Sequence, residues 1–456
     1  MDETDGTSGR APPRLELWGG VECTVNRVGD RFHDQLRASG HHQRDGDIDA
    51  IACLGVKAVR YPVLWERTES RPGCHEFAWS DRRLAMLQAH DITPIVGLLH
   101  HGSGPPHTHL LDPRFPQLFA SYAGAVARRY PWVDFYTPIN EPHTTARFSA
   151  LYGHWYPHHR SDESFCRALL HQCRATQLAM REIRRVRPQA RLLHTEDLGA
   201  TLSTPALRYQ AEFENERRFL SHDLLCGRVR RSHPLHDYLR GAGASDDELA
   251  RLRDEPLPDL LGVNHYITSV RFLDDRIQHY PPGSVGGNGW HRYADVEAVR
   301  VCDDGILEPH ELLHELWSRY RLPIAVTEAH LACTVDEQIR WFDELWRAAL
   351  RCRELGADVR AVTAWSLFGA FDWDSLVTRK TGQYEPGAFD VGGGTPEPTE
   401  LARYLQQVAG GAVDGHSALA MPGWWRQPSR LLHPPAACAR PPGRSRVPSR
   451  HRRPGP

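Results

Sequence analysis

Two glutamates are the residues of this chain best suited to carry out chemistry. Glu141 follows the apolar run Thr137-Pro-Ile-Asn140, and Glu328 ends the run Pro323-Ile-Ala-Val-Thr327. Each run is typical of a buried strand, so we expect each carboxylate at the C-terminal end of a strand. In a barrel of parallel strands, these ends form the active-site face. Two carboxylates meeting there can break a glycosidic bond, one as general acid/base and the other as nucleophile.

Eight strands alternate with helix-length amphipathic stretches along the chain. This alternation is typical of parallel strands joined by crossover helices. It predicts the α/β class and a single (β/α)8 TIM barrel with enlarged loops over residues 14–410. The predicted strands are 15–20, 56–61, 92–100, 133–140, 190–195, 260–266, 322–327 and 359–367, and the clearest helices are 47–54, 79–90, 115–130 and 164–186.

The ends of the chain differ from the middle in composition. We expect residues 1–13 to be disordered and 411–456 to be a Pro/Arg-rich, mostly disordered tail, although 422–428 looks able to pack. From residue 434 onward there is no acidic residue and no hydrophobic periodicity. Such a segment buries too little apolar surface to offset its ordering entropy. It also lacks interleaved aromatic residues that stack on bases, so no nucleic-acid partner is predicted.

The overall composition narrows the classes of protein. The chain has 456 residues, 40% of them hydrophobic, and a formal net charge of -2. This charge gives no general attraction to nucleic acids or anionic membranes. No apolar run reaches about 18 residues, and the N-terminus lacks the regions of a secretory signal, so we predict no membrane partner and a cytoplasmic location. The ten cysteines form no C-x-x-C pair, so reduced thiols and no bound metal are expected.

Several motifs, in order along the chain, resemble those of the family 1 glycoside hydrolases. They are Val59-Arg-Tyr-Pro-Val-Leu-Trp65, Asn140-Glu-Pro142, Gly262-Val-Asn-His-Tyr266, Val326-Thr-Glu328 and Ala364-Trp-Ser-Leu-Phe-Gly-Ala-Phe-Asp-Trp373. The chain is similar from about residue 15 to 405 to this family of retaining, β-glucosidase-like barrel enzymes.

The resemblance implies a role for each residue around the two carboxylates. It makes Glu141 the acid/base and Glu328 the nucleophile. Asn140 is then expected to hydrogen-bond the sugar 2-hydroxyl, and Tyr266 to orient the nucleophile and favour its ionised form. Arg60 is expected beneath both carboxylates, where its charge favours an ionised nucleophile.

Further residues are expected to bind the sugar. The resemblance implies a contact from His101, an aromatic floor from Trp365, and contacts from Trp373 and from Asp372, which replaces a glutamate that grips the 4- and 6-hydroxyls. At the position of a sugar-binding glutamine, either Asn26 or Glu22 is available.

The chain departs from the family pattern around the sugar. Gly102 stands where the family has an aromatic residue, and Ala329-His330 replaces Asn-Gly after the nucleophile. His resists the positive φ that Gly commonly serves, so we expect a different loop conformation there. The pair His100–His101 could suggest a metal site, but adjacent strand residues point to opposite faces, which argues against it.

Retaining hydrolysis of β-linked small glycosides or oligosaccharides, by double displacement, is the function we predict, with a carbohydrate as partner. One alternative is a catalytically weak barrel that binds a sugar or sugar nucleotide and supports a partner reductase; another is a transglycosidase. No Gly-x-Gly-x-x-Gly follows a strand, and Gly392–Gly394 reads as a loop, so no cofactor is predicted. Neither the sugar nor the oligomeric state is predicted.

Overall fold

A computed structural model of the protein describes residues 14–303, 306–412 and 414–438. The contacts divide these residues into two units, each described by itself. The first unit takes in the chain up to Leu198, Arg218–Tyr266 and Glu308–Gly423. The second takes in Gly199–Arg217, Ile267–Leu307 and the described residues from Trp424 onward.

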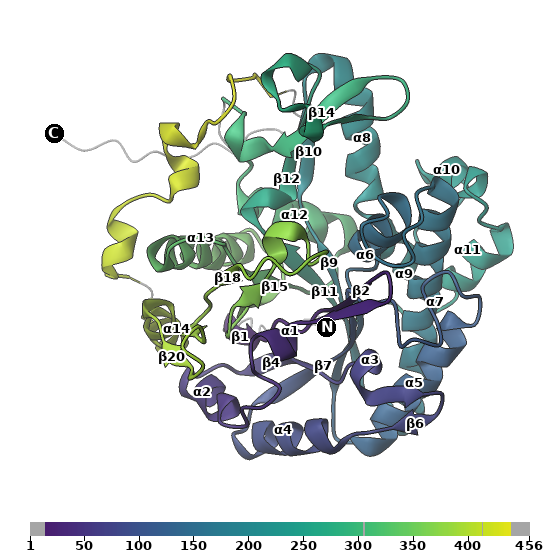
Figure 1. The fold of residues 1–456 in the computed structure, drawn as a ribbon, viewed down its shortest axis with the longest axis vertical. Helices are drawn as coiled ribbons and strands as arrows, with labels where there is room; N and C mark the ends of the chain where they lie inside the picture. The colour runs from purple at the N-terminus through teal and green to yellow at the C-terminus, as the bar shows by residue number, and fades with distance from the viewer. Residues whose placement is uncertain (1–13, 304–305, 413, 439–456) are drawn as a thin grey trace, which may run out of the picture. The chain divides into compact units, whose positions relative to one another are not determined.

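A closed barrel of eight parallel strands forms the centre of the first unit (Figure 1). Neighbouring strands follow the order β1-β16-β15-β11-β9-β8-β7-β4, after which β4 pairs with β1 and closes the ring. All eight predicted strands are therefore confirmed, with small shifts at their ends. They are β1 Glu16–Gly20, β4 Ala58–Pro62, β7 Thr93–His100, β8 Phe135–Asn140, β9 Arg191–Asp197, β11 Leu260–His265, β15 Ile324–Ala329 and β16 Val359–Ala364.

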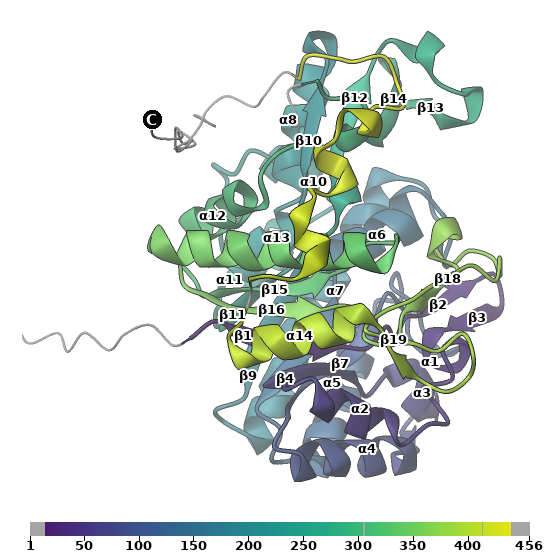
Figure 2. The same ribbon diagram turned by 90° about the vertical axis from the view of Figure 1, so that its left-hand side faces the viewer.

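Helices surround the barrel, as expected from the amphipathic stretches. In both ribbon views α13 and α14 lie side by side against the strands (Figures 1 and 2). The longer helices are α2 Asp47–Cys53, α4 Ala78–Ala89, α5 Phe115–Arg129, α7 Asp162–Val186, α11 Asp246–Arg253, α12 Pro309–Tyr320, α13 Val335–Glu354 and α14 Glu400–Gly410. The short ones are α1 Gln35–Ala38, α3 Trp65–Thr68, α6 Pro142–Ala146, α9 Leu220–Leu225 and α10 His236–Gly241. The four predicted helices correspond to α2, α4, α5 and α7.

The barrel interior is filled by side chains, so it is a packed core that supports the site above it. One cluster of buried residues draws a member from nearly every strand: Trp18, Ala58, Ile95, Leu193, Leu260, Ala325 and Ala361, with Phe135 packed against them. Higher in the barrel, Gly262 leaves room for its neighbours. A Cβ there would lie 2.6 Å from Thr195 Cγ2 and 2.7 Å from Thr327 Oγ1, closer than packed atoms allow.

Four two-stranded antiparallel ribbons form in the loops of the first unit, within the described residues. They pair β2 Val25–Val28 with β3 Arg31–Asp34, β5 Glu69–Arg71 with β6 Cys74–His75, β17 Ala370–Phe371 with β18 Tyr384–Glu385, and β19 Phe389–Asp390 with β20 Glu397–Pro398. The β17–β18 ribbon belongs to the loop that follows β16 and carries Asp372 at its first turn.

The second unit is built from parts of the chain outside the predicted barrel strands: the region after the fifth strand, the enlarged loop after the sixth, and part of the C-terminal segment. Its sheet has the order β10-β12-β14-β13, with strands β10 Ala200–Ser203, β12 Val270–Asp274, β13 Val285–Gly287 and β14 Arg292–Glu297, and α8 Arg208–Arg217 belongs to the same unit. A buried cluster of Leu207, Ala211, Leu273 and Tyr293 lies within it. The β10–β12 pairing joins segments far apart in sequence, which local patterns do not reveal, whereas β13 and β14 form a local hairpin that was not predicted.

The C-terminal segment agrees with expectation around Trp425 and differs from it at residues 434–438. Trp425 is buried, as the packing potential of 422–428 suggested, and Arg430 donates to the Val299 carbonyl (2.8 Å). Residues 434–438, expected to be disordered, include the buried Ala436, and Cys302 and Cys438 form a disulfide where reduced thiols were expected. Their separation of 136 residues gave no local signal of pairing. The predicted disorder of 1–13 and 439–456 lies outside the described residues.

None of the helices within the described ranges is long and apolar enough to cross a membrane.

Candidate active site

Glu141 lies at the turn between β8 and α6. Its backbone is left-handed (φ 47°, ψ 64°), a conformation that costs a non-glycine residue free energy unless its surroundings hold it. Two backbone hydrogen bonds do so: Glu141 N–H donates to the Thr195 carbonyl (3.1 Å), and Thr145 N–H donates to the Glu141 carbonyl (2.9 Å). Pro142 then begins the helix, where its missing N–H is not needed. The carboxylate of Glu141 is buried at the C-terminal end of the barrel strands.

Glu328 lies near the C-terminal end of β15, so it is on the same face of the barrel as Glu141. Its carboxylate accepts from Arg60 Nη1 through Oε1 (2.7 Å) and from the Tyr266 hydroxyl through Oε2. The same arginine nitrogen donates to the Thr327 carbonyl (2.8 Å), and the guanidinium carbon lies 4.8 Å from the centre of the Trp365 ring. Glu328 is 2% exposed, so both donors act on it with little screening by water.

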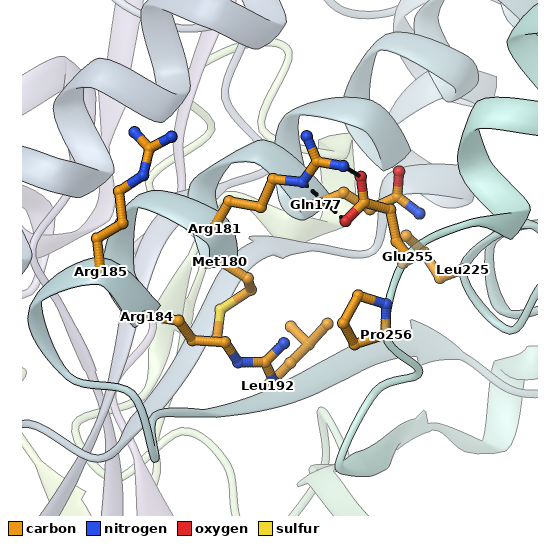
Figure 3. A pocket seen from close by; sticks show the side chains of 9 residues that line it. All are labelled: Gln177, Met180, Arg181, Arg184, Arg185, Leu192, Leu225, Glu255 and Pro256. Atoms are coloured by element: carbon orange, nitrogen blue, oxygen red, sulfur yellow. Dashed lines mark hydrogen bonds and ion pairs between the residues drawn. The ribbon is translucent and has the colours of Figure 1, made fainter.

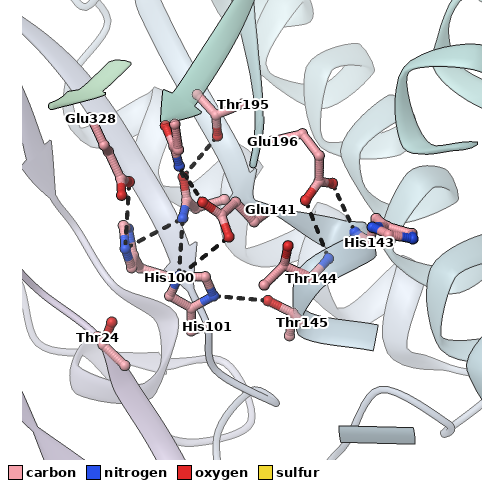
Figure 4. A network of polar contacts seen from close by, with 12 residues as sticks. Thr24, His100, His101, Glu141, His143, Thr144, Thr145, Thr195, Glu196 and Glu328 are labelled. Atoms are coloured by element: carbon pink, nitrogen blue, oxygen red, sulfur yellow. Dashed lines mark hydrogen bonds and ion pairs between the residues drawn. The ribbon is translucent and has the colours of Figure 1, made fainter. Parts of the chain in front are cut away.

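Polar contacts connect the surroundings of the two carboxylates, and Figure 4 shows Glu141 and Glu328 with His100 and His101 between them. Arg60 Nη2 donates to Oδ1 of Asn140, the residue before Glu141 (2.6 Å). Asn264 Nδ2 donates to Glu141 Oε1 (2.6 Å), and the Thr327 hydroxyl donates to Asn264 Oδ1 (2.7 Å). The barrel therefore fixes both carboxylates through side chains that are themselves held in place.

His100 and His101 complete the centre of this network. His101 Nε2 lies 3.9 Å from Glu141 Oε2, and His100 Nε2 lies 3.9 Å from Glu328 Oε1. Burial, with the Arg60 charge, lowers the pKa of His101 to about 3, and burial also puts the pKa of His100 well below its usual range. Both rings are therefore neutral near pH 7. Within the described ranges, no group of three or more His, Cys, Asp or Glu side chains is arranged to hold a metal ion.

The surroundings act differently on the two carboxylates. Burial raises the pKa of Glu141 well above its usual range, and the charges of Glu328, Asp197 and Glu196 raise it further. Burial also raises the pKa of Glu328, but the Arg60 charge and the Tyr266 hydroxyl oppose that rise. Two carboxyls in such contrasting surroundings can hold one proton between them, with Glu141 as the protonated partner.

Two of the residues expected to bind sugar, Trp365 and Trp373, lie against the histidines of this centre, whereas Asp372 is partly engaged elsewhere. Trp365 stacks on His100 with ring centres 5.3 Å apart, and Trp373 lies 5.8 Å from the ring of His101. Asp372 is left-handed (φ 61°), and its Oδ1 accepts from Thr381 N–H (2.8 Å) and Gly382 N–H (2.7 Å). One oxygen of Asp372 is therefore engaged with its own loop.

Asn26 and Glu22, the two candidates for one position, have different surroundings. Asn26 Nδ2 donates to the Val377 carbonyl (3.1 Å), and among the described residues no donor reaches its fully buried Oδ1. Glu22 Oε1 accepts from Thr24 N–H (2.8 Å). Burial raises the pKa of Glu22 to about 7, to which the charge of Glu328 contributes. Glu22 is thus the candidate electrostatically linked to the carboxylate pair.

The loops that depart from the family pattern are accommodated locally. Ala329 continues β15, and His330 Nε2 lies 3.0 Å from Glu385 Oε2, while its φ is not positive. As expected, the histidine avoids the left-handed conformation. At Gly102, a Cβ would lie 1.8 Å from Glu66 Oε1, so this glutamate occupies the space of a side chain at 102.

Sequence reasoning missed several residues of the network. Asn264 stands in the quoted Gly262–Tyr266 motif but was given no role. Glu196 and Thr195 are at the end of β9, and the Thr195 hydroxyl donates to Asn140 Oδ1 (2.8 Å). The signal for Glu196 was the same as for Glu141 and Glu328: a carboxylate at the C-terminal end of a predicted strand.

A separate pocket of about 360 Å³ lies on the outer side of the barrel, beside α7 (Figure 3). It is lined by Gln177, Met180, Arg181, Arg184, Arg185, Leu192, Leu225, Glu255 and Pro256. Leu192 is near the start of β9, whereas the carboxylate network is at the strand's other end. Arg181 Nε donates to Glu255 (2.9 Å) and Arg184 Nη2 donates to Asp259 (2.9 Å). The pocket is thus remote from the carboxylates.

A closed (β/α)8 barrel with two buried glutamates at the C-terminal ends of its strands has the architecture of many glycoside hydrolases. The chain matches Glycosyl hydrolase family 1 over residues 22–385. It therefore belongs to this family, and it is a β-glucosidase-like glycoside hydrolase, as the motifs predicted.

Individual relatives agree with this assignment. The chain is 25% identical over 410 residues to the bifunctional beta-D-glucosidase/beta-D-fucosidase of Bifidobacterium breve, covering 80% of this chain and 86% of that protein. It is 23% identical over 419 residues to beta-glucosidase 47 of Arabidopsis thaliana, covering 81% and 76%. The fold is similar to that of the family 1 β-glucosidase of Thermotoga maritima in complex with isofagomine lactam, with a TM-score of 0.69 and 18% identity, covering 87% of this chain and 98% of that one.

Proposed function

We propose that this protein hydrolyses β-linked small glycosides or oligosaccharides with retention of configuration, using Glu328 as nucleophile and Glu141 as acid/base. The observation that carries the proposal is the contrast between the two carboxylates. Glu328 accepts from the cationic Arg60 and from Tyr266, which favours the ionised form that a nucleophile needs. Glu141 has other carboxylates around it, which favours the protonated form that a general acid needs.

In the first step, Glu328 attacks the anomeric carbon while Glu141 gives its proton to the departing glycosidic oxygen. In the second, Glu141 takes a proton from water, and the water oxygen displaces Glu328 from the sugar. Arg60 and Tyr266 stay on Glu328 throughout and stabilise it as a leaving carboxylate. Arg60 and Thr195 hold Asn140 through its Oδ1, and its amide nitrogen, which lies beside His100 and His101, is the group that donates to the sugar.

The stereochemistry of the first product tests this proposal. Aryl β-glucosides and β-fucosides are the first substrates to try, because the Bifidobacterium relative is named for both activities. Proton NMR during turnover is expected to show the β-anomer of the free sugar first, followed by slow mutarotation. The α-anomer appearing first would indicate inversion and contradict the proposal. Binding of the same sugars without turnover would instead favour the sugar-binding alternative.

The role of Glu141 has its own test. Glu141→Ala is expected to lower kcat/KM on substrates with poor leaving groups by about 10²- to 10⁴-fold, the usual contribution of a general acid. On a 2,4-dinitrophenyl glycoside, whose leaving group needs no acid, the second step is expected to limit turnover; azide needs no general base, so added azide should raise kcat there and give the β-glycosyl azide. Glu354→Ala, at an exposed glutamate at the end of α13, is the matched control and should behave as wild type. An α-azide product, or no rescue, would argue against Glu141.

A further inference from the structure

Glu196 is a third buried carboxylate in contact with the turn that carries Glu141. It lies in β9 and is fully buried. Its Oε2 accepts from His143 N–H (2.8 Å), and its Oε1 accepts from Thr144 N–H (3.2 Å) (Figure 4). These are two of the backbone donors at the start of α6, which have no partner within the helix itself. Glu196 therefore holds the helix that begins immediately after Glu141.

Strand β9 holds this turn at two points. The Thr195 carbonyl accepts from Glu141 N–H (3.1 Å), and the carboxylate of the neighbouring Glu196 accepts from His143 N–H in the first turn of α6. A residue in the left-handed region keeps that conformation only when its surroundings enforce it. Glu141 is such a residue, so the direction of its carboxylate depends on both contacts.

The far side of Glu196 is held as well. The Ser221 hydroxyl, from α9, donates to Glu196 Oε2 (2.8 Å), and His194 Nε2 lies 3.3 Å from the same hydroxyl. His194 and His222 are packed with ring centres 4.8 Å apart. Burial lowers the pKa of His222 to about 4 and that of His194 well below its usual range, so both rings are neutral. Glu196 thus has neutral donors around it and no cation that neutralises its charge among the contacts described.

We propose that Glu196 is a positioning residue for the acid/base: its carboxylate fixes the turn that directs Glu141 at the glycosidic oxygen, and its negative charge helps Glu141 keep its proton. This inference rests on the proposed function, because it presumes that Glu141 delivers the proton. It assigns Glu196 no contact with the substrate.

The negative charge of Glu196 raises the pKa of Glu141. The groups that face Glu141 are Glu328 from β15, Asn264 from β11, His101 from the residue that follows β7, and Asp197 and Glu196 from β9. Burial raises the pKa of Glu196 to about 7, against hydrogen bonds from His143, Ser221 and Thr144, so the carboxyl is ionised above neutral pH. Removing this charge lowers the pKa of Glu141. Because Glu141 works in its protonated form, the basic limb of the kcat/KM profile should then move to lower pH.

The experiment compares Glu196→Gln, Glu196→Ala and Ser221→Ala on two β-glycosides of one sugar. The 2,4-dinitrophenolate leaving group departs without a proton, whereas a methylphenol leaving group needs the proton of Glu141. A misdirected acid is expected to lower kcat/KM on the poor leaving group by about 10²-fold and on the dinitrophenyl glycoside by under about threefold. Ser221→Ala keeps the contacts to α6 and should show a smaller loss of the same kind. Glu354→Gln is the control.

Each outcome decides between the possibilities. Selective loss on the poor leaving group, with the basic limb at lower pH in Glu196→Gln, supports the inference. Equal loss on both substrates with an unchanged pH profile would reduce Glu196 to a structural role and overturn it. If Glu196→Ala does not fold, Glu196→Gln and Ser221→Ala give the same readout. An inactive wild type would remove the proposed function itself, whereas an active wild type with an unselective Glu196→Gln would remove this inference alone.

Discussion

At the residue scale, the hydroxyl of Tyr266 hydrogen-bonds one of the two glutamates, Glu328, and so affects its pKa. It donates to Glu328 and favours the ionised nucleophile. Tyr266→Phe removes that donor, so the pKa of Glu328 should rise. Because the nucleophile acts when ionised, the acidic limb of kcat/KM is expected to move to higher pH, and kcat to fall by about 10- to 100-fold.

Tyr404→Phe is the matched control for this change. The Tyr404 hydroxyl donates to Asp343 (2.7 Å) in another buried tyrosine–carboxylate pair, between α14 and α13. Its loss should reduce stability and leave the acidic limb where it is. An acidic limb that moves equally in both variants, or in neither, would show that Tyr266 does not tune Glu328.

The strand pattern of the sequence predicted the two glutamates, and the family resemblance predicted Arg60, Asn140 and Tyr266. The structure gathers all five in one network. Whether they act as proposed stays a prediction. Glu196 directly follows its predicted strand, as Glu141 and Glu328 follow theirs, but none of the motifs that resemble the family includes it, so it was given no role. The engagement of Asp372 by residues 381–382 could not be foreseen, since it depends on how a distant part of the same loop folds back.

At the scale of elements, β11 connects barrel packing to the acid/base. Its Gly262 lets Thr327 lie close, and Thr327 holds Asn264 against Glu141. Gly262→Ala forces a methyl group into this contact. We expect a loss of about 1–3 kcal/mol in the free energy of unfolding, typical of overpacking, and a lower kcat. Denaturant unfolding and steady-state kinetics on the same preparation check both.

Gly410→Ala is the control for that substitution. A Cβ at Gly410, in the last turn of α14, meets nothing within 4 Å, so alanine there should be neutral or slightly stabilising. A Gly262→Ala variant as stable and active as Gly410→Ala would show that β11 tolerates the methyl group and that Asn264 is not held through Thr327.

The elements that sequence predicted well are those whose signal is local. Each barrel strand is a short apolar run followed by an amphipathic helix, and all eight were found at their expected places. In the sheet β10-β12-β14-β13, β13 and β14 form a short local hairpin, but the β10–β12 pairing joins two separated segments and depends on non-local contacts. The same holds for the disulfide between Cys302 and Cys438.

At the scale of the whole molecule, the family and the fold agree with the motif-based prediction, while the sugar is undetermined. The match to Glycosyl hydrolase family 1 spans residues 22–385, which includes every residue of the carboxylate network. Gly102, His330 and Asp372 lie in loops and Ala329 is the last residue of β15, while the barrel strands that hold Glu141 and Glu328 are intact. Loop variation on a constant barrel is how this fold changes specificity.

In the proposed mechanism, Glu328 forms a covalent bond to the sugar, and this bond can be trapped. The protein is incubated with 2,4-dinitrophenyl 2-deoxy-2-fluoro-β-glycosides of several sugars, then analysed by intact mass and peptide mapping. We expect wild type and Glu141→Ala to gain the mass of one fluorosugar, bound to Glu328. Glu328→Gln should gain none. A label on another residue, or an equal label in Glu328→Gln, would contradict the proposed mechanism.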